Sequence, residues 1–403
     1  MCLKSVPQDR REGSVGRRAA VVTAVLAAAA LLTAGCSSGD ALTASATSAP
    51  ASSSGAAPAS PPGGGSTVPA APAKGSVKVV GTVATGLNTP WGVAVLQDGG
   101  LLVASRDTGR IVRVDPATGR TTEAGTVPGV SSGGEGGLLG LAVSPGFATD
   151  HLVYAYFTTD SDNRIARMLY DPAKPAGEQL GAPDTIVRGI PHGAIHNGGR
   201  IAFGPDGMLY AGTGESGDRG LAQDKKSLGG KILRMTPDGE PVHGNPEADS
   251  LVYSYGHRNV QGLTWDAEGR LWASEFGQDT WDEVNLIEPG KNYGWPVVEG
   301  LAHRAGYADP IATWHTDDAS PSGIAYAKGS LWMASLRGAR LWRIPLAGTK
   351  AAAPPQAFLV GTYGRLRTVV AEADGDLLLT TSNTDGRGDP RKGDDRILRL
   401  KVG

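Results

Sequence analysis

The chain has 403 residues, a formal net charge of −2 at pH 7, 19% charged side chains and 59 glycines. This balance excludes a polycationic nucleic-acid binder, because binding to phosphates needs an excess of Lys and Arg, and the glycine content argues against a coiled coil or helical bundle. The composition favours an all-β globular protein in which glycines mark the turns.

The first 36 residues are typical of a lipoprotein signal peptide. An uncharged run rich in Ala, Val and Leu covers residues 19–34 and follows a basic region. The run is shorter than the roughly 20 apolar residues that a membrane span needs, but it suits an export signal. It ends in LLTAGC, which resembles a bacterial lipobox. We therefore expect lipidation at Cys36, with an ordinary signal peptide cut nearby as the alternative.

The next segment, residues 37–75, is mostly Ser, Ala, Pro, Gly and Thr. Such a composition cannot bury a core, so it predicts a disordered spacer. The two cysteines, Cys2 and Cys36, both precede this spacer, so the rest of the chain offers no disulfide and no cysteine nucleophile. We expect an exported, extracytoplasmic protein that meets the membrane only through a lipid anchor.

Residues 76–403 contain a phrase that recurs six times: an apolar run, an Asp/Gly turn, a second apolar run, a polar break and a third run. The copies cover Pro90–Asp115, Leu138–Asp171, Gly199–Gly239, Gln261–Gly290, Pro321–Leu346 and Leu366–Leu400. The turns favour hairpins because Gly and Asp accept positive φ. Several strands per repeat, at a spacing of about 45–60 residues, are typical of a β-propeller. We predict six blades over residues 76–403, with Val77–Val83 as an outer strand that closes the ring.

Candidate chemistry lies in the irregular segments between the copies, because the loops at one mouth of a propeller carry its function. His196, in the HNGGR segment, directly precedes an inner strand and suits a general base near neutral pH. Arg258, Asn259 and Gln261 occupy the same place before the fourth repeat and offer hydrogen-bond donors to an anion or a carbonyl oxygen. The alternative for each residue is a structural role between blades.

Charged residues in the later repeats suggest two further binding sites, one for an anion and one for a metal ion. Arg365 and Arg367 are two residues apart and so share one face of a strand. With Arg337 from the fifth repeat they could bind a polyanion. The acidic segment from Glu275 to Glu283 offers oxygen ligands of the kind that Ca²⁺ prefers, although its spacing matches no EF-hand loop. Solvated surface charge is the alternative for both groups.

Five longer segments are informative beyond these single residues: LLGLAVSPGF, HNGGR, YSYGHRNVQGL, DEVNLIEPGKNYGWP and RLRTV. Together they resemble the soluble quinoprotein glucose/sorbosone dehydrogenases, and the resemblance extends from about residue 87 to residue 400. It implies a six-bladed propeller that uses pyrroloquinoline quinone (PQQ) and Ca²⁺ to oxidise aldoses.

The resemblance implies roles for the residues that bind the cofactor. Arg258 and Asn259 fall where the family binds the quinone oxygens, and Arg258 is expected to assist catalysis. Arg365 and Arg367 match the pair that holds the cofactor carboxylates, and Gln261 is expected at the same site. PQQ carries three carboxylates, which agrees with a cluster of arginines.

The resemblance also implies catalytic, metal and substrate roles. His196 takes the place of the general base, and Glu135 takes that of a polar residue near the sugar. Gly277 and Gln278 match the positions whose backbone carbonyls bind Ca²⁺. Arg337 occupies the place of a lysine that contacts the cofactor.

We therefore expect a PQQ- and Ca²⁺-dependent dehydrogenase that oxidises the C1 hydroxyl of an aldose to a lactone and passes the electrons to an external acceptor. The alternative is a non-catalytic propeller that binds a glycan or a protein at the cell surface. A third function, a Ca²⁺-dependent lactonase on a related scaffold, is disfavoured, because it needs several carboxylates around one metal and the candidate pore residues are mostly Arg and His.

Overall fold

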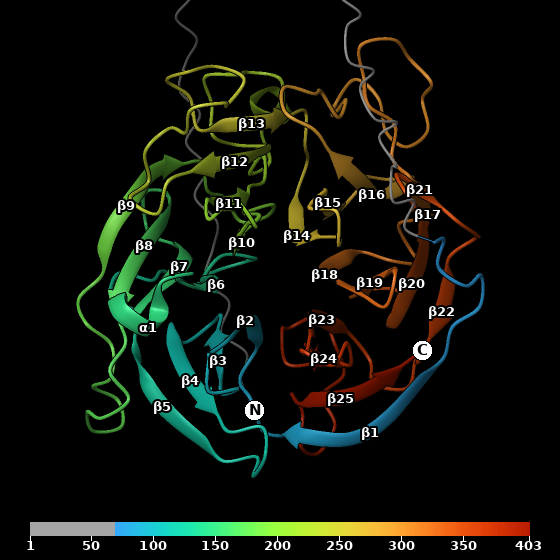
Figure 1. Cartoon of the computed structure of the whole chain (residues 1–403). Coiled ribbons are helices and arrows are strands. Elements are labelled where there is room, and N and C mark those ends of the chain that lie inside the picture. Colours follow the sequence, from blue (N-terminus) through green and yellow to red (C-terminus); the bar gives the residue numbers. More distant parts are fainter. Residues whose placement is uncertain (1–68) are drawn as a thin grey trace, which may run out of the picture. The chain divides into compact units, whose positions relative to one another are not determined.

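The structure, a computed structural model, describes residues 69–403; the predicted signal peptide, Cys36 and residues 37–68 of the predicted spacer lie outside the described residues. The regular elements of residues 69–403 are nearly all strands, and they form six sheets arranged in a ring (Figure 1). The prediction of an all-β, six-bladed propeller is confirmed. Two short helical turns interrupt the strands in this part of the chain, α1 (Phe147–Asp150) and η1 (Arg219–Ala222). Among the same residues, no helix has the length and apolar character that a membrane crossing requires.

The first three blades are antiparallel sheets whose strands follow one another in chain order, from the inner strand to the outer one. Blade 1 consists of β2 (Pro90–Val95), β3 (Leu101–Ser105), β4 (Arg110–Val114) and β5 (Thr121–Thr126). Blade 2 consists of β6 (Leu138–Val143), β7 (Leu152–Thr158), β8 (Asn163–Leu169) and β9 (Asp184–Ile190). Blade 3 consists of β10 (Arg200–Phe203), β11 (Leu209–Gly212), β12 (Lys231–Met235) and β13 (Val252–Tyr255).

The last three blades follow the same plan, except that blade 5 has an added edge and blade 6 takes its outer strand from the start of the propeller. Blade 4 consists of β14 (Val260–Trp265), β15 (Leu271–Glu275), β16 (Trp281–Ile287) and β17 (Ala312–His315). Blade 5 consists of β18 (Pro321–Ala327), β19 (Ser330–Ser335), β20 (Arg340–Ala347), β21 (Lys350–Ala351) and β22 (Gln356–Phe358). Blade 6 consists of β23 (Leu366–Ala371), β24 (Leu377–Thr381), β25 (Ile397–Val402) and β1 (Val77–Ala84).

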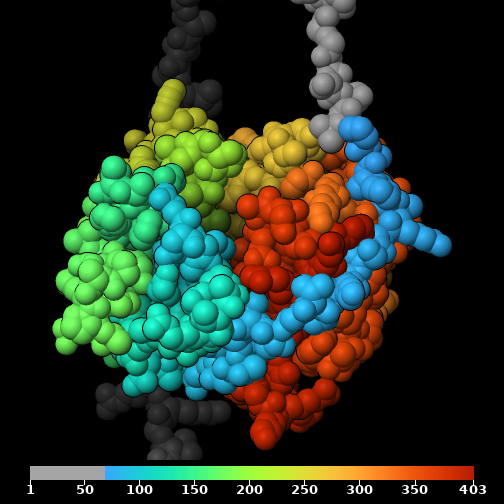
Figure 2. Space-filling view, turned by 60° about the horizontal axis from the view of Figure 1, so that its bottom comes forward, coloured from blue at the N-terminus to red at the C-terminus, as the bar shows by residue number. Residues whose placement is uncertain are grey.

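Blade 6 closes the ring with a strand from the N-terminal side of the propeller. β1 pairs antiparallel with β25, as predicted for Val77–Val83, and Figure 2 shows it along the outside of the C-terminal blade. The backbone nitrogen of Ser76 donates to the Gly403 carbonyl oxygen at 2.6 Å, and the Gly403 nitrogen donates back to Ser76 at 3.2 Å. The two ends of the propeller therefore meet in one sheet.

Residues 71–75, which the composition placed in the spacer, pack against blade 5. The Ala71 nitrogen donates to the Leu346 carbonyl oxygen at 2.8 Å. The Arg343 guanidinium donates to the Pro72 carbonyl oxygen at 2.8 Å, and the Gly75 nitrogen donates to the Gln356 side chain at 2.8 Å. These hydrogen bonds attach a stretch of low hydrophobicity to the blade, so the propeller unit begins before residue 76.

The blades are buried on both faces, because each lies between two neighbours. All five side chains of β3 are buried, and Leu102 on this strand packs with Leu141 and Phe157 of blade 2 in one hydrophobic cluster. Burial on both faces explains why the inner strands read as continuous apolar runs and not as strict alternation.

The inner strands approach one another so closely that glycine is required between them. A Cβ atom on Gly92 would lie 2.5 Å from the Leu139 carbonyl oxygen, and one on Gly140 would overlap the Gly199 carbonyl oxygen. Register shifts between Pro90 and Val93 in β2, and between Leu138 and Leu141 in β6, place Gly92 and Gly140 outside the regular ladder, as bulges do.

Candidate active site

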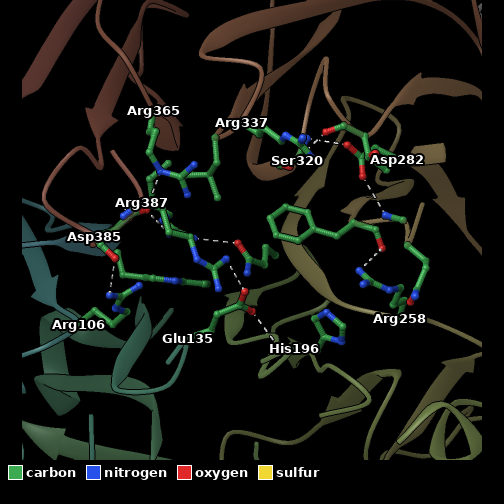
Figure 3. Close-up of a pocket in the computed structure, with 18 residues that line it drawn as sticks. Arg106, Glu135, His196, Arg258, Asp282, Ser320, Arg337, Arg365, Asp385 and Arg387 are labelled. Atoms are coloured by element: carbon green, nitrogen blue, oxygen red, sulfur yellow. Dashed lines mark hydrogen bonds and ion pairs between the residues drawn. The ribbon is translucent and has the colours of Figure 1, made fainter. Parts of the chain in front are cut away.

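A cavity of about 420 Å³ opens at the mouth where the inner strands begin (Figure 3). Its charged lining consists of six arginines, three carboxylates and one histidine: Arg106, Arg258, Arg337, Arg365, Arg367, Arg387, Glu135, Asp282, Asp385 and His196. Figure 3 shows Arg365 and Arg387 on one side of the cavity and Arg258 on the other. The excess of guanidinium groups makes the cavity a site for a polyanion.

The structure brings together nine of the ten site residues that the sequence predicted on the propeller. These lining residues are Glu135, His196, Arg258, Gln261, Gly277, Gln278, Arg337, Arg365 and Arg367. Asn259 is fully buried and lies behind the wall, where its side-chain oxygen accepts from the Gly198 nitrogen at 2.9 Å. The lipidation site, Cys36, lies outside the described residues.

His196 sits directly before β10, with a backbone φ of +54°. Its Nδ1 lies 2.8 Å from Oε1 of Glu215, a residue that is 1% exposed. Because an ionised carboxylate can only accept, Nδ1 carries the proton of a neutral ring and Nε2 is left to accept one. Glu215 follows β11, the hairpin partner of β10, so blade 3 supplies both members of the pair.

Glu135 connects His196 to the opposite wall. One carboxylate oxygen accepts from the His196 nitrogen at 2.9 Å, and the other accepts from Arg387 at 2.8 Å. Burial raises the pKa of Glu135, but the His196 nitrogen and the Arg387 guanidinium outweigh burial and hold the pKa below its ordinary value. Glu135 is therefore a carboxylate in the pocket at neutral pH, with the strained His196 backbone fixed against it.

Arg258 enters the cavity from the segment before β14. Its guanidinium lies over the ring of Trp295, 5.5 Å from the centroid, and donates weakly to the Phe276 carbonyl oxygen at 3.4 Å. The Nε atom of Arg258 has no partner among residues 69–403. The neighbouring His257 is structural, since it is buried between Glu275 at 2.7 Å and Ser254 at 2.8 Å.

Arg365 and Arg367 converge on one carboxylate, that of Asp385. The distances to its Oδ2 are 2.9 Å from Arg365 Nε and 3.5 Å from Arg367 Nη2. Arg367 Nη1 also donates to the Gln261 side chain at 2.9 Å, whereas Arg367 Nε has no partner in the described chain. Burial lowers the pKa of Arg367 to about 9, against the opposite effect of Asp385. This guanidinium remains a cation at neutral pH.

Arg337 stands apart from the other arginines of the cavity. It pairs with Asp317 at 2.6 Å, and its side chain is 62% exposed. Arg337 therefore lies on the rim, where it can meet only the outer part of a bound molecule.

Gly277 and Gln278 lie in the loop between β15 and β16. Their backbone nitrogens donate to Asp282 at 2.9 Å and to Glu299 at 2.5 Å, while their carbonyl oxygens accept no hydrogen bond from the described residues. Burial raises the pKa of Asp282 to about 6. No group of three or more His, Cys, Asp or Glu side chains between residues 69 and 403 could hold a metal ion. A hard cation at this loop would therefore rely on the backbone carbonyls.

The residues present fit both groups that the sequence motifs imply. A partnerless guanidinium nitrogen on Arg367 matches a carboxylate of PQQ, and one on Arg258 matches a quinone oxygen. The open carbonyl oxygens of Gly277 and Gln278 match Ca²⁺, which takes oxygen ligands.

Sequence reasoning missed several residues of the site. Glu215 is one of them; its place 19 residues after His196, just beyond the strand that pairs with β10, was the available signal. Trp91, Arg106 and Arg387 also line the cavity, and nothing in their local sequence separates them from surface or core residues.

A family model described as "Glucose / Sorbosone dehydrogenase" matches residues 87–398. Quinoprotein glucose dehydrogenase B from Acinetobacter calcoaceticus is 31% identical over 285 residues, which cover 61% of this chain and 59% of that protein. Aldose sugar dehydrogenase YliI from Escherichia coli K12 is 31% identical over 272 residues, which cover 65% of this chain and 72% of that protein.

One solved structure shares a much higher identity. The PQQ-bound form of an aldose sugar dehydrogenase from Streptomyces coelicolor is 73% identical, with a TM-score of 0.82, and the match covers 83% of this chain and 100% of that chain.

Proposed function

Because the chain belongs to the glucose/sorbosone dehydrogenase family, we propose that it is a PQQ- and Ca²⁺-dependent dehydrogenase that oxidises the C1 hydroxyl of an aldose to a lactone. The resemblance that its sequence motifs indicated is confirmed by this membership and by the similarity to a PQQ-bound aldose sugar dehydrogenase.

One observation carries the proposal: buried guanidinium donors converge on the cavity without partners. Arg258 Nε and Arg367 Nε are buried and unpaired among the described residues. Leaving such donors unpaired is costly, and the carboxylate and quinone oxygens of PQQ would remove that cost. We assign Arg365 and Arg367 to these carboxylates and Arg337 to the outer edge of the cofactor.

Three further assignments concern the quinone end of the cofactor. Arg258 and Gln261 line the cavity and offer donors to the quinone oxygens. The Nδ2 group of Asn259 is buried without a partner in the described chain, which supports a cofactor role although the side chain lies behind the wall. The carbonyl oxygens of Gly277 and Gln278 would hold Ca²⁺.

The chemistry that this chain supplies begins with a fixed base. Glu215 orients His196 so that Nε2 faces the substrate hydroxyl, and Nε2 takes the hydroxyl proton as the C1 hydride leaves. Glu135, an ionised acceptor, orients the sugar hydroxyls beside His196. When bound, PQQ supplies the acceptor for the hydride pair of electrons, and Ca²⁺ supplies Lewis-acid polarisation of the quinone.

The products would be a lactone, a proton on His196 and two electrons, which bound PQQ would accept. An external acceptor must collect these electrons before the next turnover. We also propose that the chain is exported and held at the membrane by a lipid on Cys36, on the basis of the LLTAGC segment and the apolar run before it.

The test is a titration of the protein with PQQ, with and without Ca²⁺, followed by absorbance and then by addition of aldoses and an artificial electron acceptor. Saturable PQQ binding and sugar-dependent reduction of the acceptor are expected. The His196→Ala protein should bind PQQ but not turn over. Absence of PQQ binding would overturn the proposal and favour the non-catalytic binding propeller, whose glycan binding would survive His196→Ala.

A further inference from the structure

The channel contains a second cavity, which the proposed function does not use. It has a volume of about 380 Å³ and lies at the mouth opposite the candidate active site, where the inner strands end. Its lining comes from the six inner strands, β2, β6, β10, β14, β18 and β23. We call it the lower cavity.

One charged residue, Arg200, lines the lower cavity, and no acidic residue does. Arg200 opens β10 and is 7% exposed. Its Nε donates to the Gln261 carbonyl oxygen at 2.8 Å, and its Nη2 donates to the Thr368 hydroxyl at 3.0 Å. The guanidinium carbon lies 4.4 Å from the ring centroid of Trp91. Arg200, from blade 3, thus contacts blades 1, 4 and 6 at the axis of the ring.

The charge of Arg200 is uncompensated within the described chain. No ion pair to Arg200 forms among residues 69–403, and its Nη1 makes no hydrogen bond there. Burial lowers the pKa of Arg200 to about 9, so the group is still a cation at neutral pH. A buried charge without a counter-charge is expensive, and an arginine cannot escape that cost by losing its proton near pH 7.

Within residues 69–403, Arg258 also lacks a carboxylate partner, but it faces the candidate active site, and the three remaining buried arginines have other partners. Arg106 pairs with Asp107 at 2.6 Å, and Arg367 approaches Asp385 at 3.5 Å. Arg343 has no carboxylate partner, but both of its Nη atoms are bonded, to Gln356 at 2.9 Å and to Pro72 at 2.8 Å. Arg200 is thus the buried arginine that lines the lower cavity, and within the described chain it has neither a carboxylate partner nor a hydrogen bond at Nη1.

We propose that the lower cavity is a binding site for one small monovalent anion, a halide or a short carboxylate, held by Arg200 Nη1. A single guanidinium group can neutralise one negative charge. The surrounding walls bring no second cation, so a divalent anion would remain partly unpaired there. Nη1 is the nitrogen of Arg200 left without a hydrogen bond in the described chain, which suits a ligand with a single small anionic group. The proposal is independent of whether PQQ binds at the other mouth.

The first test uses the full chain without added cofactor, crystallised and soaked in sodium bromide. Anomalous scattering should place a bromide ion within hydrogen-bond reach of Arg200 Nη1. The Arg200→Met protein should lose that ion, whereas Arg343→Met, which removes another buried arginine far from the cavity, should keep it. No ion at Arg200, or an ion that persists in Arg200→Met, overturns the proposal; the latter would be an adventitious ion only.

The second test works in solution and does not depend on crystals. Exchange of chloride on the protein should broaden its ³⁵Cl resonance, and acetate should displace the chloride. The specific part of the broadening should fall at least tenfold in Arg200→Met and persist in Arg200→Lys, which keeps the charge. Equal broadening in the wild-type protein and in both variants would contradict the site. Sulfate at the same ionic strength should displace chloride far less than acetate does; equal displacement would also contradict it.

Discussion

The Glu215 carboxylate decides which nitrogen of His196 can take a proton. It lies 2.8 Å from Nδ1 and is almost fully buried, so it fixes both the tautomer and the orientation of the ring. His196, the proposed base, thus depends for its tautomer on Glu215, a residue that would not contact the substrate.

The first prediction concerns this pair. Glu215→Gln should lower kcat about 10- to 100-fold, because the amide can donate to Nδ1 and so favour the wrong tautomer, while general-base catalysis is worth about 10²- to 10⁴-fold in all. PQQ affinity should change little. Steady-state kinetics with a PQQ titration measures both quantities. Glu247→Gln, at an exposed glutamate, is the control, and an unchanged kcat in Glu215→Gln would refute the role.

The second prediction concerns Arg367. Arg367→Met should raise the Kd of PQQ at least about tenfold, since a hydrogen bond to a charged group contributes about 1.5–3 kcal/mol. Equilibrium titration by absorbance measures the change. Arg110→Met removes an exposed arginine paired with Glu123 at 3.6 Å and should bind PQQ like the wild-type protein. Equal affinities in all three proteins would remove Arg367 from the cofactor site.

The site residues that could be predicted from sequence were those within recurring or recognisable segments, such as His196 in HNGGR and Arg365 in RLRTV. Arg387 could not be found in this way. It reaches Glu135 at 2.8 Å across 252 positions of the chain, and only the closed ring brings the two together. Ion pairs of this kind depend on the arrangement of blades, which no local pattern specifies.

At the scale of the strand, β16 has two buried acidic side chains near its start, Asp282 and Glu283. Burial raises the pKa of Glu283 to about 8, and the nearby Glu275 adds to the effect. Glu283 therefore keeps its proton in the folded protein at a pH where the unfolded chain has lost it. Between its ordinary value of 4.5 and about 8, the unfolded state binds fewer protons, so stability falls as the pH rises.

The third prediction follows from that sign. In the wild-type protein, the free energy of unfolding should decrease from pH 6.5 to pH 8, by at most about 1.4 kcal/mol per pH unit for one proton. Glu283→Gln should flatten this slope, because the amide does not titrate. Urea unfolding without Ca²⁺ at several pH values measures it. Glu288→Gln is the matched control on the same blade, and a wild-type-like slope in Glu283→Gln would disprove the assignment.

The strands themselves were the most predictable part of the element scale. Asp/Gly turns marked the hairpins, and in the first of them Asp98 accepts from the Gly100 nitrogen at 2.8 Å while Gly99 has a φ of +80°. The boundary near residue 75 was less accessible. Pro72 and Gly75 are attached to blade 5 by the side chains of Arg343 and Gln356. The composition of a segment does not predict which distant side chains will bind it.

At the scale of the whole molecule, the ring depends on one strand that is distant in sequence from its blade. β1 supplies the outer edge of blade 6 by pairing with β25. The repeat count predicted the number of blades and this closing strand, because each repeat must bury both faces against neighbours. The lower cavity was not predictable, since a channel is a property of the assembled ring.

The fourth prediction tests the closure. A chain that begins at residue 69 should keep the thermal stability of the propeller, whereas one that begins at residue 86 should melt at a clearly lower temperature, because it loses β1 and leaves β25 as an open edge. Differential scanning calorimetry compares the two. Equal melting temperatures would show that β1 contributes nothing to the ring.

The meeting of Ser76 and Gly403 has a consequence for how the chain could be rewired. Their mutual backbone hydrogen bonds at 2.6 and 3.2 Å mean that a short Gly/Ser linker could join the two ends without strain. New ends could then be opened in the exposed turn at residues 267–269 between β14 and β15, on the face away from His196. Such a circular permutant should fold and retain the site. All strands of blade 6 would then be consecutive in the chain, and blade 4 would instead be completed by pairing between strands from the two ends of the chain.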